Sequence, residues 1–121
     1  RQVTSLVGKS SLSKELRLMS NLDVMLTMDS ANMHLSALAG TRTVSAWGAT
    51  HPLAGFGGIQ AEGSCQVQQD MDCRPCSIFG NKPCRHGDYR CLATIDPRSI
   101  AKTLRNVLEI GTCQIKQCST N

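Results

Sequence analysis

The chain has 121 residues, of which 40% are apolar and 18% charged, so it is a globular domain rather than an intrinsically disordered segment. Its length allows one small domain, and only 3% of the residues are aromatic, so the core must be mostly aliphatic. The net charge of +4, without a dense basic stripe or aromatic platforms, argues against nucleic-acid binding. No apolar run approaches the roughly 18–20 residues that span a bilayer.

The first half of the chain alternates between strand and helix patterns. A short strand is predicted over 3–7, and apolar residues at helical spacing predict a helix over 12–20. The nearly continuous apolar run 22–28 is typical of a parallel strand covered on both faces. A second helix is predicted over 29–40 and a further strand over 43–47. This alternation predicts an α/β fold with a parallel sheet.

The second half is less regular. Residues 48–63 are glycine-rich and aperiodic, which predicts a long loop at the rim of the sheet, followed by a short strand over 65–68. The cysteine-rich stretch 73–91 has no clear period. Asp96 followed by proline begins a last helix that Gly111 ends. We therefore divide the chain into strand and helix units, a loop region and a terminal helix, over 1–50, 51–95 and 96–111.

The junction between the strand over 22–28 and the next helix carries most of the chemical information. Ligands of open parallel sheets bind beyond the carboxyl ends of the strands. The free N–H groups and the positive dipole end of the helix, at Ser30 and Ala31, are suited to a phosphate. His34 lies one turn later on the same side and could donate to a diphosphate oxygen. Equally, Asp29 could merely cap the helix, and His34 could be an interior histidine.

The sequence around this junction resembles a known family. Asn21 to Gly48, NLDVMLTMDSANMHLSALAGTRTVSAWG, is similar to the signature region of the ADP-heptose:lipopolysaccharide heptosyltransferases of glycosyltransferase family 9. Gly8 to Leu12, the turn from Cys73 to Cys76 and Ile95 to Pro97 continue the resemblance in the same order. Together these pieces cover roughly residues 6 to 108.

The resemblance implies a GT-B architecture of two Rossmann-like domains. This chain would be the carboxy-terminal part of the donor-binding domain, a partial Rossmann-like parallel sheet with flanking helices. Asp29 would act on the donor sugar or its neighbours, and the amides of Ser30 and Ala31 would contact the diphosphate together with His34. Ala31 stands where many relatives carry glycine, and it is small enough for a close backbone approach.

A second loop of the family, near the donor, is matched by Gly48 and Thr50. Thr50 could offer its hydroxyl to a phosphate, although both residues also fit simple turn positions at the rim. The resemblance implies that the catalytic residues and the acceptor domain would lie upstream of Arg1. We therefore expect the chain alone to be inactive, and its unfinished sheet to associate with itself.

The resemblance implies a glycosyltransferase that transfers heptose, or a related sugar, from an ADP-sugar to the lipopolysaccharide inner core. No cofactor is expected for the transfer. The expected location is the cytoplasm, at the inner face of the inner membrane, with peripheral membrane association. Another GT-B nucleotide-sugar enzyme, such as an epimerase, is an alternative.

Four of the seven cysteines form a separate motif, Cys73-x2-Cys76-x7-Cys84-x6-Cys91. Four thiolates at this spacing could hold one structural zinc ion, which would organise a long aperiodic loop. Reduced thiols that pack as small apolar side chains, or pair after purification, fit the pattern equally well. A free-standing zinc-ribbon-like binding module is the alternative function from another class, and the α/β pattern argues against it.

Overall fold

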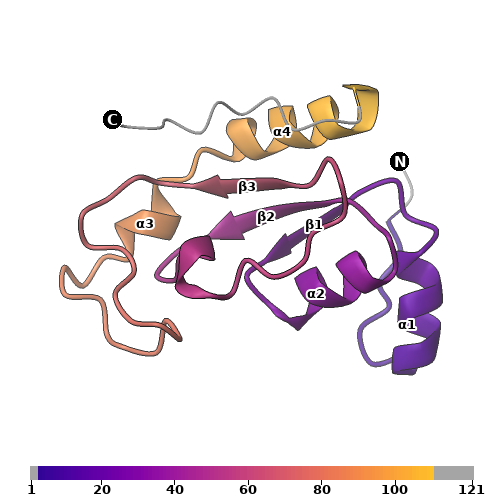
Figure 1. Ribbon diagram of the computed structural model, residues 1–121, viewed down its shortest axis with the longest axis horizontal. Helices are drawn as coiled ribbons and strands as arrows, with labels where there is room; N and C mark the ends of the chain where they lie inside the picture. Colours follow the sequence, from indigo (N-terminus) through magenta and orange to yellow (C-terminus); the bar gives the residue numbers. More distant parts are fainter. Residues whose placement is uncertain (1–2, 111–121) are drawn as a thin grey trace.

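The computed structural model describes residues 3–110, which form a parallel sheet with helices around it (Figure 1). The strands are β1 (Met25–Met28), β2 (Thr43–Trp47) and β3 (Cys65–Gln68). They hydrogen-bond in the order β1-β2-β3, and both neighbouring pairs are parallel. In the register, Met28 lies opposite Ala46, and Trp47 lies opposite Gln68. The predicted α/β fold with a parallel sheet is therefore confirmed.

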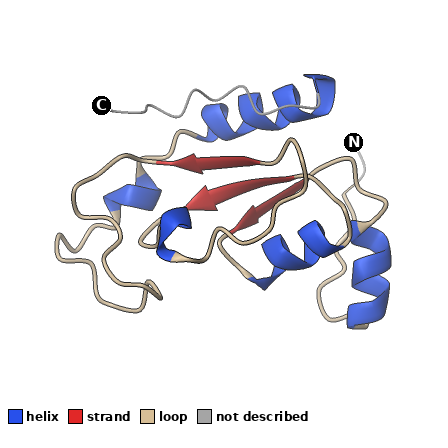
Figure 2. Ribbon diagram, in the orientation of Figure 1, coloured by secondary structure: helices blue, strands red, loops and turns tan. Residues whose placement is uncertain are grey.

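Helices lie on both sides of this sheet (Figure 2). They are α1 (Leu12–Met19), α2 (Ala31–Leu38), α3 (Arg90–Ala93), α4 (Pro97–Ile110) and the 3-10 turn η1 (Pro52–Ala54). The sheet runs between α4, which packs on β2 and β3, and α2, which packs on β1 and β2 and also contacts α1. Within residues 3–110, no helix is long and apolar enough to cross a membrane. Gly111, the predicted end of the last helix, lies outside the described residues.

Strand β2 is the rigid centre of the sheet, because all five of its residues are buried. Its buried polar side chains are hydrogen-bonded rather than left without partners. Thr43 Oγ1 donates to Oε1 of Gln60 at 2.8 Å, and Ser45 Oγ accepts from Nε1 of Trp47 at 2.9 Å. Because these buried polar groups are hydrogen-bonded, the conformation of β2 is well defined, and its carboxyl end sets the position of the residues that follow it.

The aliphatic core lies between the sheet and α4. Its buried members are Val44, Cys65, Val67, Ile95 and Val107. Helix α4 begins where the sequence predicts, because Oδ1 of Asp96 accepts the backbone N–H of Arg98 at 2.9 Å. Ile100 and Leu104 of α4 pack against this core from the same helix face.

The amino-terminal part differs from the prediction in two ways. Residues 3–7 form no strand, and Val3 and Val7 are 92% and 88% exposed. Strand β1 is shorter than predicted and is not covered on both faces, since Leu26 and Met28 are 50% and 43% exposed. One face of β1 is less covered because α4 packs on β2 and β3, whereas α2 is the helix that packs on β1. Within the described residues β1 also pairs with β2 alone, so it is an edge strand.

Candidate functional site

Two residues predicted from separate segments meet at the carboxyl edge of the sheet. Asp29 directly follows β1, and Thr50 follows β2 by three residues. Because the two strands are parallel neighbours, their carboxyl ends lie side by side, and Thr50 Oγ1 donates a hydrogen bond to Oδ2 of Asp29. Thr50 is buried, whereas Asp29 is half-buried. Within residues 3–110 this is the only hydrogen bond of the Asp29 carboxylate, so its Oδ1 remains open to a ligand.

The first turn of α2 begins beside this pair. Ser30, not Asp29, occupies the N-cap position, and its side chain makes no hydrogen bond to the helix. Its Oγ lies 3.2 Å from Oγ1 of Thr27 instead. The carboxylate of Asp29 is thus not used as a helix cap. Ser30 and Ala31 are both exposed, so the amino end of α2 is accessible to an anion.

His34 lies at the rim and is half-buried, so it is not an enclosed interior histidine. The glycine-rich loop reaches it at Gly58, where an added Cβ would lie 2.7 Å from Cε1 and Nδ1 of His34. Within the described residues the imidazole makes no hydrogen bond, and no bond joins it to Asp29 or Thr50. Its nitrogens are therefore free for a ligand.

Glycine also permits a close approach to Thr50. A Cβ at Gly80 would lie 2.9 Å from Cγ2 of Thr50, and the positive φ of 66° there favours glycine as well. Gly48, predicted as part of the site, directly follows β2, and its carbonyl accepts a hydrogen bond from Nε of Arg74. Composition marks these loops as glycine-rich, but it does not reveal which glycine contacts which side chain. Sequence reasoning therefore does not single out Gly58 and Gly80.

One shallow cavity, of about 320 Å³, borders the site without containing it. Its lining includes Leu53 and Gln66 together with Gly58, the residue that lies against His34. Neither Asp29 nor Thr50 lines it. The cavity therefore adjoins the His34 side of the predicted site and leaves the Asp29–Thr50 pair at the open edge of the sheet.

The four motif cysteines are free thiols, and Cys65 of β3 is disulfide-bonded. Within residues 3–110, no three His, Cys, Asp or Glu side chains come together in a way that could hold a metal ion. The predicted zinc ligands Cys73, Cys76, Cys84 and Cys91 are thus not assembled into a metal site. The structure does not support a zinc ion here, and zinc binding stays a prediction.

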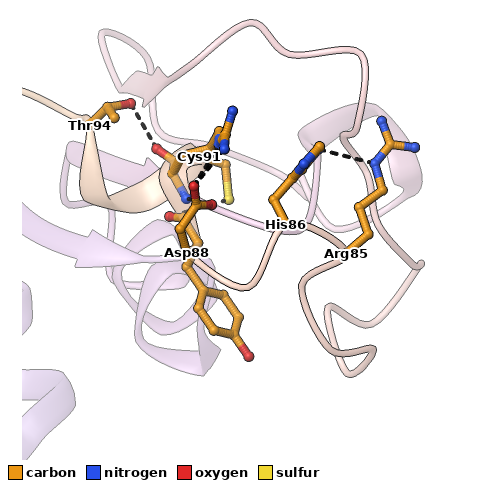
Figure 3. A network of polar contacts seen from close by, with 7 residues as sticks. Arg85, His86, Asp88, Cys91 and Thr94 are labelled. Carbon is orange, nitrogen blue, oxygen red and sulfur yellow. Dashed lines mark hydrogen bonds and ion pairs between the residues drawn. The ribbon is translucent and has the colours of Figure 1, made fainter.

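Basic side chains near these cysteines are mostly engaged with neighbours (Figure 3). Arg90 and Asp88 form an ion pair at 2.7 Å, and the side-chain hydrogen bond from Arg90 lowers the pKa of Asp88. Arg85 donates from Nε to Nε2 of His86 at 3.2 Å. These exposed contacts join residues 85 to 90 to one another, and none of them involves Asp29 or Thr50.

Comparison with known proteins places the chain in a family. Residues 1–84, more than half of the chain, match the model of "Glycosyltransferase family 9 (heptosyltransferase)". The chain is 27% identical over 108 residues to "Lipooligosaccharide heptosyltransferase 2" of Campylobacter jejuni subsp. jejuni serotype O:2. That alignment covers 89% of this chain but 33% of the relative, so the chain spans about a third of the relative's length. No solved structure gave a significant match. The chain belongs to glycosyltransferase family 9, which confirms the resemblance.

Proposed function

We propose that the protein that carries this chain transfers heptose, or a related sugar, from an ADP-sugar to the inner core of lipopolysaccharide. The chain supplies part of the donor site. The observation that carries this proposal is the contact between Asp29 and Thr50 at the carboxyl edge of β1 and β2, beside the accessible amino end of α2. Family membership and the name of the relative support the same reaction class.

The roles of the site residues follow from charge. The diphosphate of the donor is anionic, so it binds the N–H group of Ala31 at the positive end of α2, with His34 as a further donor. The N–H of Ser30 is not free for this role, because it donates to the carbonyl of Met28 at 2.9 Å. Asp29 is anionic too, and it therefore accepts hydroxyl groups of the sugar or ribose through its open Oδ1.

Thr50 takes a different role from the one first suggested by the sequence. A hydroxyl has one proton, and in this structure Thr50 donates it to Asp29. It is therefore not available as a donor to phosphate while that bond holds. We assign the hydroxyl of Thr50 the orientation of the carboxylate, and leave the diphosphate to free backbone N–H groups and His34.

During transfer, the bond between the anomeric carbon and the diphosphate breaks, and negative charge grows on the leaving diphosphate. The amino end of α2 and the imidazole of His34 stabilise that charge, which is the contribution of this chain to the rate. A hydroxyl of the acceptor forms the new bond to the anomeric carbon and gives up its proton to a basic residue. We expect that residue and the acceptor-binding site in other parts of the whole protein. The proposed reaction uses no cofactor, and it takes place in the cytoplasm at the inner face of the inner membrane.

Calorimetric binding of ADP and of ADP-heptose to the whole protein tests this function. We expect binding by the wild type and a loss of roughly 10-fold or more in Asp29→Asn for the sugar nucleotide, since a hydrogen bond to a charged group contributes about 1.5–3 kcal/mol. Asp23→Asn, an exposed carboxylate at the other end of β1, is the matched control. A wild-type protein that binds neither compound overturns the proposed function.

A further inference from the structure

The side chain of Arg74 connects the segment after β3 to the segment after β2. Its half-buried guanidinium donates from Nε to the carbonyl of Gly48, and from Nη2 to the carbonyl of Thr50 at 2.8 Å. It also donates from Nη1 to the carbonyl of Gln69, and from Nη2 to Oε1 of Gln68 at 3.1 Å. The planar guanidinium of Arg74 therefore binds four oxygen acceptors, two from the segment after β2 and two from the end of β3 and the residue after it.

The backbone of the same loop completes the connection. Between the two carbonyls held by Arg74, the carbonyl of Ala49 accepts the N–H of Cys76 at 3.0 Å. Three successive carbonyls after β2 are thus bonded to residues 74 and 76. By contrast, the N–H groups of Thr50 and His51 have no acceptor within the described residues. A loop whose carbonyls are held and whose N–H groups are free is suited to an anion.

Arg74 also brings charge to this edge of the sheet. All four of its acceptors are neutral oxygens, and the one ion pair within residues 3–110 is that of Arg90 with Asp88. Burial lowers the pKa of Arg74, which nearby Cys91 partly opposes, but an arginine stays protonated at any physiological pH. A positive charge that forms no ion pair within residues 3–110, although the carboxylate of Asp70 is near enough to raise its pKa, is therefore hydrogen-bonded to the carbonyl of Thr50.

We propose that Arg74 is a positioning residue of the donor site, which holds the Gly48–Thr50 segment so that Thr50 meets Asp29. This inference rests on the proposed function, because it assigns a purpose to the geometry of that same site. Arg74 acts through the loop and need not contact the donor. A lysine cannot replace it, since one ammonium group cannot reach four acceptors arranged around a planar fork.

The test compares two half-buried arginines in the whole protein. Arg74→Lys keeps the charge and loses the fork. Arg42→Lys is the matched control, because Arg42 donates from Nη1 to the carbonyl of Val107 at 2.8 Å, at the opposite end of β2. Dissociation constants for ADP, and the KM for donor and acceptor, are measured together with the thermal midpoint of each variant.

We expect Arg74→Lys to raise the dissociation constant for ADP and the donor KM roughly 10- to 100-fold, the effect of a displaced site segment. The KM for the acceptor should change less than about twofold, because the acceptor binds at a site distant from Arg74. Arg42→Lys should lower the thermal midpoint and leave donor binding intact. A merely structural role of Arg74 predicts the same behaviour for both variants.

Two results distinguish a failure of the role proposed for Arg74 from a failure of the proposed function. If the wild type binds ADP, Asp29→Asn weakens binding of the sugar nucleotide and Arg74→Lys binds as the wild type does, the role of Arg74 is overturned and the proposed function stands. If the wild type binds neither ADP nor ADP-heptose, both proposals fall. Should Arg74→Lys not fold, Gln68→Leu removes one acceptor of the guanidinium and must weaken ADP binding several-fold, and wild-type binding by that variant overturns the proposal.

Discussion

Thr50 donates its hydroxyl proton to the Asp29 carboxylate, so the loop after β2 orients the acidic residue at the end of β1. The two residues are 21 positions apart in sequence and belong to neighbouring parallel strands. The carboxylate therefore has a fixed direction before any ligand arrives. Such preorganisation reduces the entropy lost on binding.

Replacing Thr50 tests this relationship in the whole protein. Thr50→Val keeps the shape and removes the proton, so we expect weaker binding of the sugar nucleotide by about 1.5 kcal/mol, roughly 10-fold. Thr50→Ser keeps the hydroxyl and should bind within about threefold of the wild type. Calorimetry measures the affinity of both variants for the sugar nucleotide. Equal affinities of Thr50→Val and Thr50→Ser would show that the contact does not orient Asp29.

The contact between Gly58 and His34 gives a second prediction. Gly58→Ala would place a methyl group 2.7 Å from the imidazole, so the ring must turn away. We expect a loss of donor affinity similar to that of His34→Ala, and no further loss when the two changes are combined. Gly40→Ala is the control for backbone strain, because Gly40 also has a positive φ, of 77°, but has nothing within 4 Å of an added Cβ. Additive losses in the double variant would mean that Gly58 acts independently of His34.

The sequence predicts much of this arrangement, but not all of it. The parallel sheet and the starts of α2 and α4 follow from local signals, namely an apolar run, a small polar residue before a helix, and Asp96 before proline. The exposure of Leu26 on β1 could not be predicted, because an apolar run does not report which faces of a strand the helices cover. Arg74 was missed because its acceptors Gly48 and Thr50 are 26 and 24 positions away and are backbone atoms, which leave no trace in sequence.

The core between the sheet and α4 allows a matched test of stability. Val107 is fully buried in that core, whereas its neighbour Leu108 is 49% exposed. We expect Val107→Ala to destabilise by roughly 1.5–3 kcal/mol through lost burial and a cavity. Leu108→Ala should stay within about 0.5 kcal/mol. Thermal unfolding of the whole protein measures both, and a larger effect at Leu108 would contradict the packing described for α4.

Edge strand β1 gives a prediction for the isolated chain. Leu26 and Met28 expose apolar surface beside unpaired backbone groups, so residues 1–121 expressed alone should associate. Leu26→Lys adds a charge at the exposed edge and should shift the population toward the monomer. Light scattering after size-exclusion chromatography measures both states. A monomeric unsubstituted chain at high concentration would contradict this expectation.

The last prediction concerns the free thiols and decides between reduced cysteines and a bound zinc ion. The pKa of Cys84 is lowered, chiefly by backbone hydrogen bonds from His86 and Tyr89 to the sulfur, whereas burial raises the pKa of Cys91. Only the thiolate reacts, so with free thiols Cys84 should be alkylated at lower pH and faster than Cys91. A zinc ion on the four motif cysteines would instead protect both until a chelator is added.

Iodoacetamide labelling, with each site followed by mass spectrometry between about pH 6 and 9, resolves these cases, since an ordinary thiol titrates near pH 8.5. If the cysteines are free thiols, Cys84→Ser should remove the fastest alkylation, which is that of Cys84. Elemental analysis of protein purified without chelator adds an independent measurement. One zinc per chain, together with protection of both thiols that a chelator abolishes, would overturn the free-thiol state described for this loop and establish the metal site that its sequence motif suggests.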